Sequence, residues 1–238
     1  MRFRNHIIWG ESMFRKVLFY TNKLKPLLRF YRNILELDII NNEQTSFTVS
    51  IGTSELTFVE SDLPAFYHYA INIPGNQFSQ IKYWIKDKLT LNREGGIDEV
   101  YFPSFDADSM YFEDPAGNII ELIGRRNRDL FGYVTSDAFF NISEVGIVTP
   151  HMEAVGDDLQ DIGIPLRHGT EVNPKSVNFL GKNDTFIVLT PPERRWYFSK
   201  QQSKIYPLEI TLSTNIHLKL DKNGEFHVTE LSEDSDET

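Results

Sequence analysis

One arrangement of strands and helices recurs along the chain, and it limits the folds open to it. A short apolar strand precedes an amphipathic helix and then two or three further strands, and this plan occurs near residues 16–59, 66–123 and 144–189. A fourth copy is degenerate, because two strands between 206 and 220 have no helix between them. The sequence therefore predicts an α+β protein built from repeated modules.

The helix of the first copy illustrates the pattern. Its apolar side chains fall at the spacing of one face of an α-helix, namely Leu27, Leu28, Tyr31, Ile34 and Leu35. Pro26 is compatible with a first helical turn, where its missing N–H is not needed. We expect this helix to begin near Leu24.

Composition excludes several classes of protein. The 238 residues include no Cys, which rules out disulfides, Cys-ligated zinc, iron–sulfur clusters and thiol catalysis. A net charge of −10 argues against nucleic acid as a partner, and the sequence lacks an apolar run long enough to span a membrane. The first residues lack a signal-peptide core, so we expect a cytoplasmic protein.

Changes in composition divide the chain into segments. We predict paired modules over 14–125, a charged linker over 126–140, a third module with extra C-terminal strands over 141–228, and an acidic tail over 229–238.

Two motifs carry a resemblance to a known family. Phe30-Tyr31-Arg32 lies in the first predicted helix, and Tyr111-Phe112-Glu113-Asp114-Pro115-Ala116-Gly117-Asn118-Ile119-Ile120-Glu121-Leu122 ends the second module. With the modular plan, they resemble the vicinal oxygen chelate superfamily of glyoxalases, bleomycin-resistance proteins and extradiol dioxygenases. The resemblance implies paired βαβββ modules that form a curled mixed β-sheet with helices outside, here with a third module and a degenerate fourth.

The resemblance also implies a divalent metal on the concave side of the sheet. The family's ligands map onto His68, in the first strand of the second module, and Glu121, after the Asp-Pro-x-Gly-Asn turn. The ligand position in the first module falls on Lys16, which departs from the family pattern. Glu55 loosely matches a carboxylate position of the glyoxalase I branch.

Strand alternation supports the pairing of His68 with Glu121. His68 shares one strand face with Ala70 and Asn72, while the intervening residues are apolar. Glu121 likewise points away from Ile120 and Leu122. An imidazole and a carboxylate in one cavity suit Fe, Mn, Ni or Zn.

Lys16 leaves an alternative open. A protonated amine repels a dication and cannot ligate it. We expect Lys16 to pair with Glu121 or another inward carboxylate in place of a metal, so a metal-free site is equally compatible with the sequence. Glu55 or Asp108 could complete a metal site if one is retained.

Two further features have less specific interpretations. Glu144 falls at the first-strand ligand position of the third module, and we assign it a structural or ion-pairing role. The run Arg194-Arg195-Trp196-Tyr197-Phe198 either binds an anionic or aromatic ligand or forms a surface loop over the sheet.

Two functions follow from the resemblance. The first is a metal-dependent lyase or dioxygenase acting on a small substrate with vicinal oxygens. The second is a metal-free protein that sequesters a small molecule in the same cavity, which Lys16 and the many Phe and Tyr residues favour. Either would bind a small-molecule ligand, and the family resemblance leaves a homodimer open.

Overall fold

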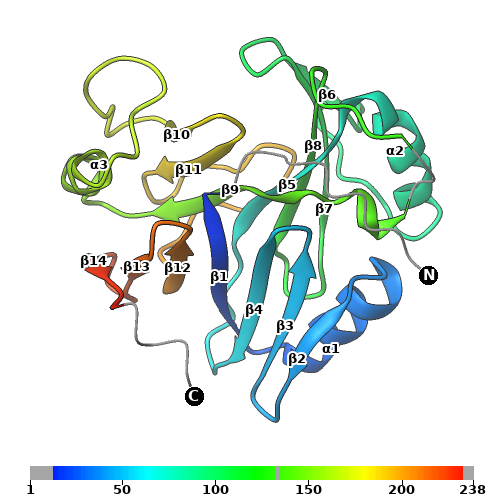
Figure 1. Cartoon of the computed structure of the whole chain (residues 1–238), viewed down its shortest axis with the longest axis horizontal. Coiled ribbons are helices and arrows are strands. Elements are labelled where there is room, and N and C mark those ends of the chain that lie inside the picture. The colour runs from blue at the N-terminus through cyan, green and yellow to red at the C-terminus, as the bar shows by residue number, and fades with distance from the viewer. Residues whose placement is uncertain (1–12, 132–134, 233–238) are drawn as a thin grey trace.

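Two seven-stranded sheets pack face to face in the computed structural model, which describes residues 13–131 and 135–232 (Figure 1). Sheet A has the strand order β14-β13-β12-β1-β4-β3-β2, and sheet B has the order β10-β11-β9-β5-β8-β7-β6.

Sheet A combines strands from both ends of the chain. They are β1 (Phe14–Thr21), β2 (Ile39–Asn42), β3 (Ser46–Ile51), β4 (Ser54–Glu60), β12 (Leu208–Leu212), β13 (Ile216–Leu220) and β14 (Phe226–Glu230). The β1–β4 pair is parallel and the other neighbours are antiparallel, which makes the sheet mixed.

Sheet B is formed from the middle of the chain. Its strands are β5 (His68–Pro74), β6 (Val100–Phe102), β7 (Ala107–Glu113), β8 (Ile119–Arg125), β9 (Asn141–Val148), β10 (Asn178–Lys182) and β11 (Thr185–Thr190). Here β5–β8 and β9–β11 are the parallel pairs, and β5 and β9 join antiparallel at the centre.

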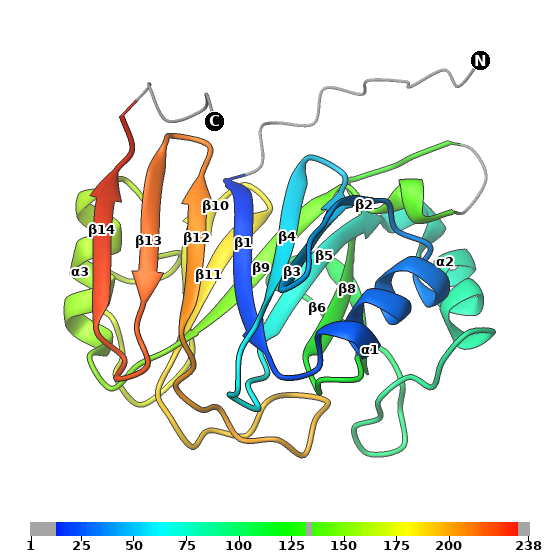
Figure 2. The ribbon, with the colours of Figure 1, turned by 90° about the horizontal axis from the view of Figure 1, so that it is seen from below.

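Three α-helices flank the sheets. Helix α1 (Leu24–Arg29) begins at the predicted residue and continues as a π-helical segment, Phe30–Ile34. Helix α2 (Phe78–Lys86) lies at the same end of the molecule, whereas α3 (Met152–Asp161) lies at the opposite end, as Figure 2 shows from another side. Short 3₁₀ turns occupy Gly75–Gln77 and Ser136–Ala138.

The modules pair in a nested order. Sheet A joins the first module to the C-terminal strands through β1 and β12, and sheet B joins the second module to the third through β5 and β9. The α+β class of paired βαβββ modules in curled mixed sheets is confirmed. Its pairing differs from the expected one, because the first two modules lie in different sheets.

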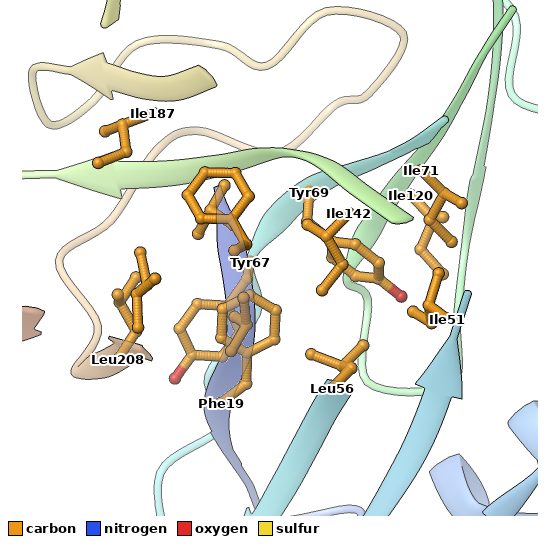
Figure 3. Close-up of a cluster of buried hydrophobic side chains, with 14 of the residues drawn as sticks. Phe19, Ile51, Leu56, Tyr67, Tyr69, Ile71, Ile120, Ile142, Ile187 and Leu208 are labelled. Atoms are coloured by element: carbon orange, nitrogen blue, oxygen red, sulfur yellow. The ribbon is translucent and has the colours of Figure 1, made fainter. Parts of the chain in front are cut away.

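The main core lies between the sheets, and Figure 3 shows part of it. Phe19 of β1 stacks on Tyr67, with ring centroids 4.1 Å apart, and both side chains are buried. Tyr69, Ile71 and Ile120 point into the same layer. This leaves the alternate residues of β5 and β8 on the opposite face of sheet B, as strand alternation predicts.

Within the described residues, no helix is long and apolar enough to cross a membrane. The predicted tail beyond residue 232 and the linker residues 132–134 lie outside the described residues, and the segment boundaries stay predictions.

Candidate metal centre

Three buried side chains meet on the outer face of sheet B. His68 comes from β5, Glu121 from β8 and Glu144 from β9. The His68 Nε2 atom lies 3.8 Å from a Glu121 carboxylate oxygen and 3.9 Å from one of Glu144. One candidate ligand atom from each residue lies within 4.8 Å of the others. We call these residues the His–Glu–Glu cluster.

Strand register explains why they meet. Ala70 on the central strand β5 pairs with Glu121 on one side and with Glu144 on the other. The two carboxylates therefore flank a methyl group, and His68, two residues before Ala70, points to the same face. Since Ala70 is buried and small, the space in front of it can hold all three polar side chains.

A backbone contact fixes the His68 tautomer. Its Nδ1 atom lies 3.2 Å from the carbonyl oxygen of Ile119. A carbonyl only accepts, so Nδ1 carries the proton and donates it, which leaves the lone pair of a neutral ring on Nε2. That lone pair faces the two carboxylates. Metal-binding histidines are commonly oriented in this way.

The carboxylates lie in an unfavourable environment without a cation. Burial raises the pKa of Glu121, the nearby charge of Glu144 raises it further, and His68 opposes this effect. The Tyr111 hydroxyl lies within hydrogen-bonding reach of Glu121, and burial and the two carboxylates raise its pKa well above 10. Tyr111 is therefore a neutral donor at pH 7.

The cluster fits a divalent metal. Nitrogen and oxygen ligands lie about 2.0–2.2 Å from zinc, so neighbouring ligands in a tetrahedral site are roughly 3.4 Å apart. The distances of 3.8 and 3.9 Å from Nε2 require only small side-chain rotations to reach this geometry. Two buried carboxylates and an imidazole lone pair supply the charge and donors that a dication needs.

Strand register also shows which residue stands where a fourth protein ligand would be expected. Glu121 pairs with the residue two positions after His68. In the third module, the residue two positions after Glu144 is Gly146, which pairs with Val188. Val188 thus occupies the position equivalent to Glu121, and its side chain cannot bind a metal. The cluster therefore offers three protein ligands.

A cavity of about 190 Å³ lies in front of the cluster. Its wall is largely aromatic, with one cationic side chain, and the described lining residues besides the cluster are Phe102, Phe105, Tyr111, Ile123, Val177, Phe179, Val188, Arg194, Trp196 and Tyr197. The Trp196 ring lies 4.9 Å from that of His68 and covers one side of it. Three residues of the 194–198 run thus line the cavity, which is compatible with both predicted interpretations, ligand binding and a loop over the sheet.

Lys16 and Glu55 lie elsewhere. They belong to β1 and β4 of sheet A, where both side chains are about half exposed and their charged atoms lie 3.8 Å apart. Lys16 pairs with Glu55 and not with Glu121, so it does not block the His–Glu–Glu cluster. Asp108 is also outside the cluster, because Arg126 binds both of its carboxylate oxygens.

Glu144 is the member of the cluster that sequence reasoning did not place beside His68. It stood at a ligand position of its module, but we assigned it a structural role because that module had no fourth partner. The second module is its partner, and this pairing brings Glu144 to His68.

Known proteins resemble this chain over different parts of its length. A family model described as toxoflavin-degrading enzyme matches residues 142–194, which include Glu144 and Arg194. The metallothiol transferase FosB of Staphylococcus epidermidis is 26% identical over 113 residues, which cover 44% of this chain and 77% of FosB.

Solved structures share the fold. Glyoxalase I of Zea mays, in a V278E variant, superposes with a TM-score of 0.56 at 13% identity and covers 91% of each chain. The chain therefore shares the fold of this glyoxalase I, which agrees with the resemblance of its sequence to the vicinal oxygen chelate superfamily. A "putative dioxygenase" of Bacillus subtilis gives a TM-score of 0.53 at 16% identity, covering 76% of this chain. The match spans only 64% of that dioxygenase. The names of these similar proteins cover several different activities.

Proposed function

We propose that His68, Glu121 and Glu144 bind a divalent metal and that the chain is a metal-dependent lyase or dioxygenase for a small substrate with vicinal oxygens. The convergence of three buried ligand atoms beside an open cavity carries this proposal. The glyoxalase, dioxygenase and metallothiol transferase relatives support it. The metal would be Fe, Mn, Ni or Zn.

When bound, the metal would supply a Lewis acid that polarises substrate oxygens. Val188 provides no ligand, so substrate oxygens can approach from the cavity, as in catalytic sites with three protein ligands. The Tyr111 hydroxyl donates a hydrogen bond to the Glu121 carboxylate and so orients it. Trp196 and the aromatic wall exclude water and contact the substrate body.

Arg194 gives the cavity a preference for substrates with negative charge. Burial and the neighbouring Arg195 lower the pKa of Arg194, and no carboxylate pairs with it among the described residues. A guanidinium in this setting favours an anionic or enolic oxygen on the substrate.

The test is metal content, measured by plasma mass spectrometry on untagged protein purified without chelator. We expect about one metal per chain, lost in His68→Ala and Glu144→Gln and kept in Glu55→Gln, the matched carboxylate in sheet A. Absence of metal from the parent protein after reconstitution would overturn the proposal.

A second candidate function is metal-free binding of a small aromatic ligand in the same cavity. The aromatic wall favours it, although Lys16, which had favoured it in the sequence, lies outside the cavity. Saturable ligand binding by metal-free protein, unchanged in His68→Ala, would support this function. The cytoplasmic location and the homodimer stay predictions.

A further inference from the structure

A second hollow, of about 320 Å³, adjoins the cavity of the metal centre, and Phe105 lines both. Its charged lining residues are Arg125, Arg167, Lys182 and Asp184. We call it the cationic hollow. None of the three residues of the His–Glu–Glu cluster lines it.

Arg125 is the buried element of the hollow. It follows Glu121 by four residues on β8, so both side chains lie on the same face of sheet B. Its Nη1 atom donates to Asn72 and to Ser143, and Nε lies 3.2 Å from an Asp184 oxygen. The remaining nitrogen, Nη2, is buried without a hydrogen-bond partner. A buried donor left unpaired is unfavourable, so an acceptor at this atom would be stabilising.

A second guanidinium lies close by. The Cζ atom of Arg167 is 3.5 Å from the centroid of the Phe105 ring, and the side chain also donates to the Ser104 carbonyl. Burial and the charge of Arg125 lower the pKa of Arg167, and the charge of Glu144 opposes this effect only in part. The backbone of Ser104 and the Phe105 ring hold Arg167 in place.

The negative charge at the hollow is already shared. Asp184 is the acidic residue among the described residues that line it. Its carboxylate pairs with Arg125 and, at 2.6 Å, with Arg128. Arg167 and Lys182 have no carboxylate partner of their own among the described residues. Glu144 and Glu121 of the neighbouring cluster also act on Arg125, but neither lines the hollow, so its own described lining has three cationic side chains and one acidic side chain.

We propose that the cationic hollow is a binding site for an anionic oxygen group, a phosphate or a carboxylate. Planar guanidinium groups bind such groups through paired N–H donors, and Arg125, which lines the hollow, has one such nitrogen, Nη2, without a partner. The anion is either a free ion or the charged end of a molecule that passes Phe105 into the neighbouring cavity. The site does not depend on the metal.

The first test is calorimetric titration of the metal-free full chain with inorganic phosphate at constant ionic strength. We expect one saturable site that is weakened at least about tenfold in Arg167→Gln and in Lys182→Gln. These two side chains are partly or fully exposed, so their replacement leaves the fold intact. Lys25→Gln, which removes one charge from the distant helix α1, should leave binding unchanged.

Three other results would overturn the proposal of an anion site in the cationic hollow. These are no saturable binding, equal binding by the parent and both hollow variants, or an equal loss in Lys25→Gln. A loss in His68→Ala would place the phosphate at the metal centre and contradict the proposal as well. Phenyl phosphate distinguishes the two sources of the anion. If phenyl phosphate binds more tightly than inorganic phosphate, and Tyr197→Ala reduces that binding, the natural ligand is a molecule that spans both cavities. If the two compounds bind equally, the ligand is a free anion.

Discussion

The Tyr31 hydroxyl donates a hydrogen bond to the Asp114 carboxylate at 2.9 Å. The two motifs that indicated the family in the sequence therefore meet in the interior, one from the first helix and one from the turn before β8. The Tyr69 hydroxyl lies 2.5 Å from the same Tyr31 hydroxyl, which connects the turn to strand β5.

Asp114 should be a major determinant of stability. It accepts from the backbone N–H groups of Ala116 and Asn118 and from the Asn118 side chain, in addition to Tyr31. Asp114→Ala would leave several buried donors unpaired, so we expect a loss of at least about 3 kcal/mol in the free energy of unfolding. Chemical denaturation measures it. Asp62→Ala, at an exposed site, should change the value by less than about 0.5 kcal/mol, and a similar small change at Asp114 would contradict this account.

Ala70 keeps open the space between the two carboxylates. Ala70→Val adds two methyl groups there, so we expect metal content to fall below a tenth of the parent value. Overpacking should also cost about 1–3 kcal/mol in stability. Ile71→Val, whose side chain points into the core between the sheets, is the control, because it should cost about 0.5–1.5 kcal/mol and retain metal. Full metal content in Ala70→Val would show that the ligands lie elsewhere.

Glu144→Gln should affect the metal-free and metal-bound proteins in opposite directions. Removing this charge relieves repulsion with Glu121, so the melting temperature of the metal-free protein should rise at neutral pH. Metal affinity should fall more than about 100-fold, because loss of supporting residues alone costs 10–100-fold. Thermal melts with and without Mn or Zn measure both effects. A metal-induced shift as large as that of the parent would count against Glu144 as a ligand.

Metal affinity should increase as the pH rises toward neutrality and above. The raised pKa of Glu121 means that the folded metal-free protein holds a proton that the unfolded chain releases at lower pH. Raising the pH from the ordinary carboxyl range to this raised pKa therefore destabilises the metal-free fold, and it removes the proton that competes with the metal. The stabilisation by metal should grow across this window. Metal titrations at pH 5.5, 6.5 and 7.5 would test this prediction. A metal affinity that stays constant or falls across these pH values would contradict it.

Periodicity was sufficient to predict the class of the fold but not the partners of each module. Alternation along β5 and β8 correctly put His68 and Glu121 on one face, because side-chain direction is a local property. Pairing of β5 with β9 depends on backbone edges, which carry no signal in the side chains. For this reason Glu144 was read as a lone carboxylate. The edge strand β2 (Ile39–Asn42) was also missed, because asparagine is uncommon in strands.

The nested order of the modules has a consequence for synthesis on the ribosome. Sheet B is complete once β11 has emerged, since all its strands lie between His68 and Thr190. Strand β1 is made first, yet one of its edges has no partner until β12 arrives near Leu208. Until Leu208 has been made, the backbone N–H and C=O groups along this edge of β1 lack their partner strand, and an unpaired strand edge can pair with another chain.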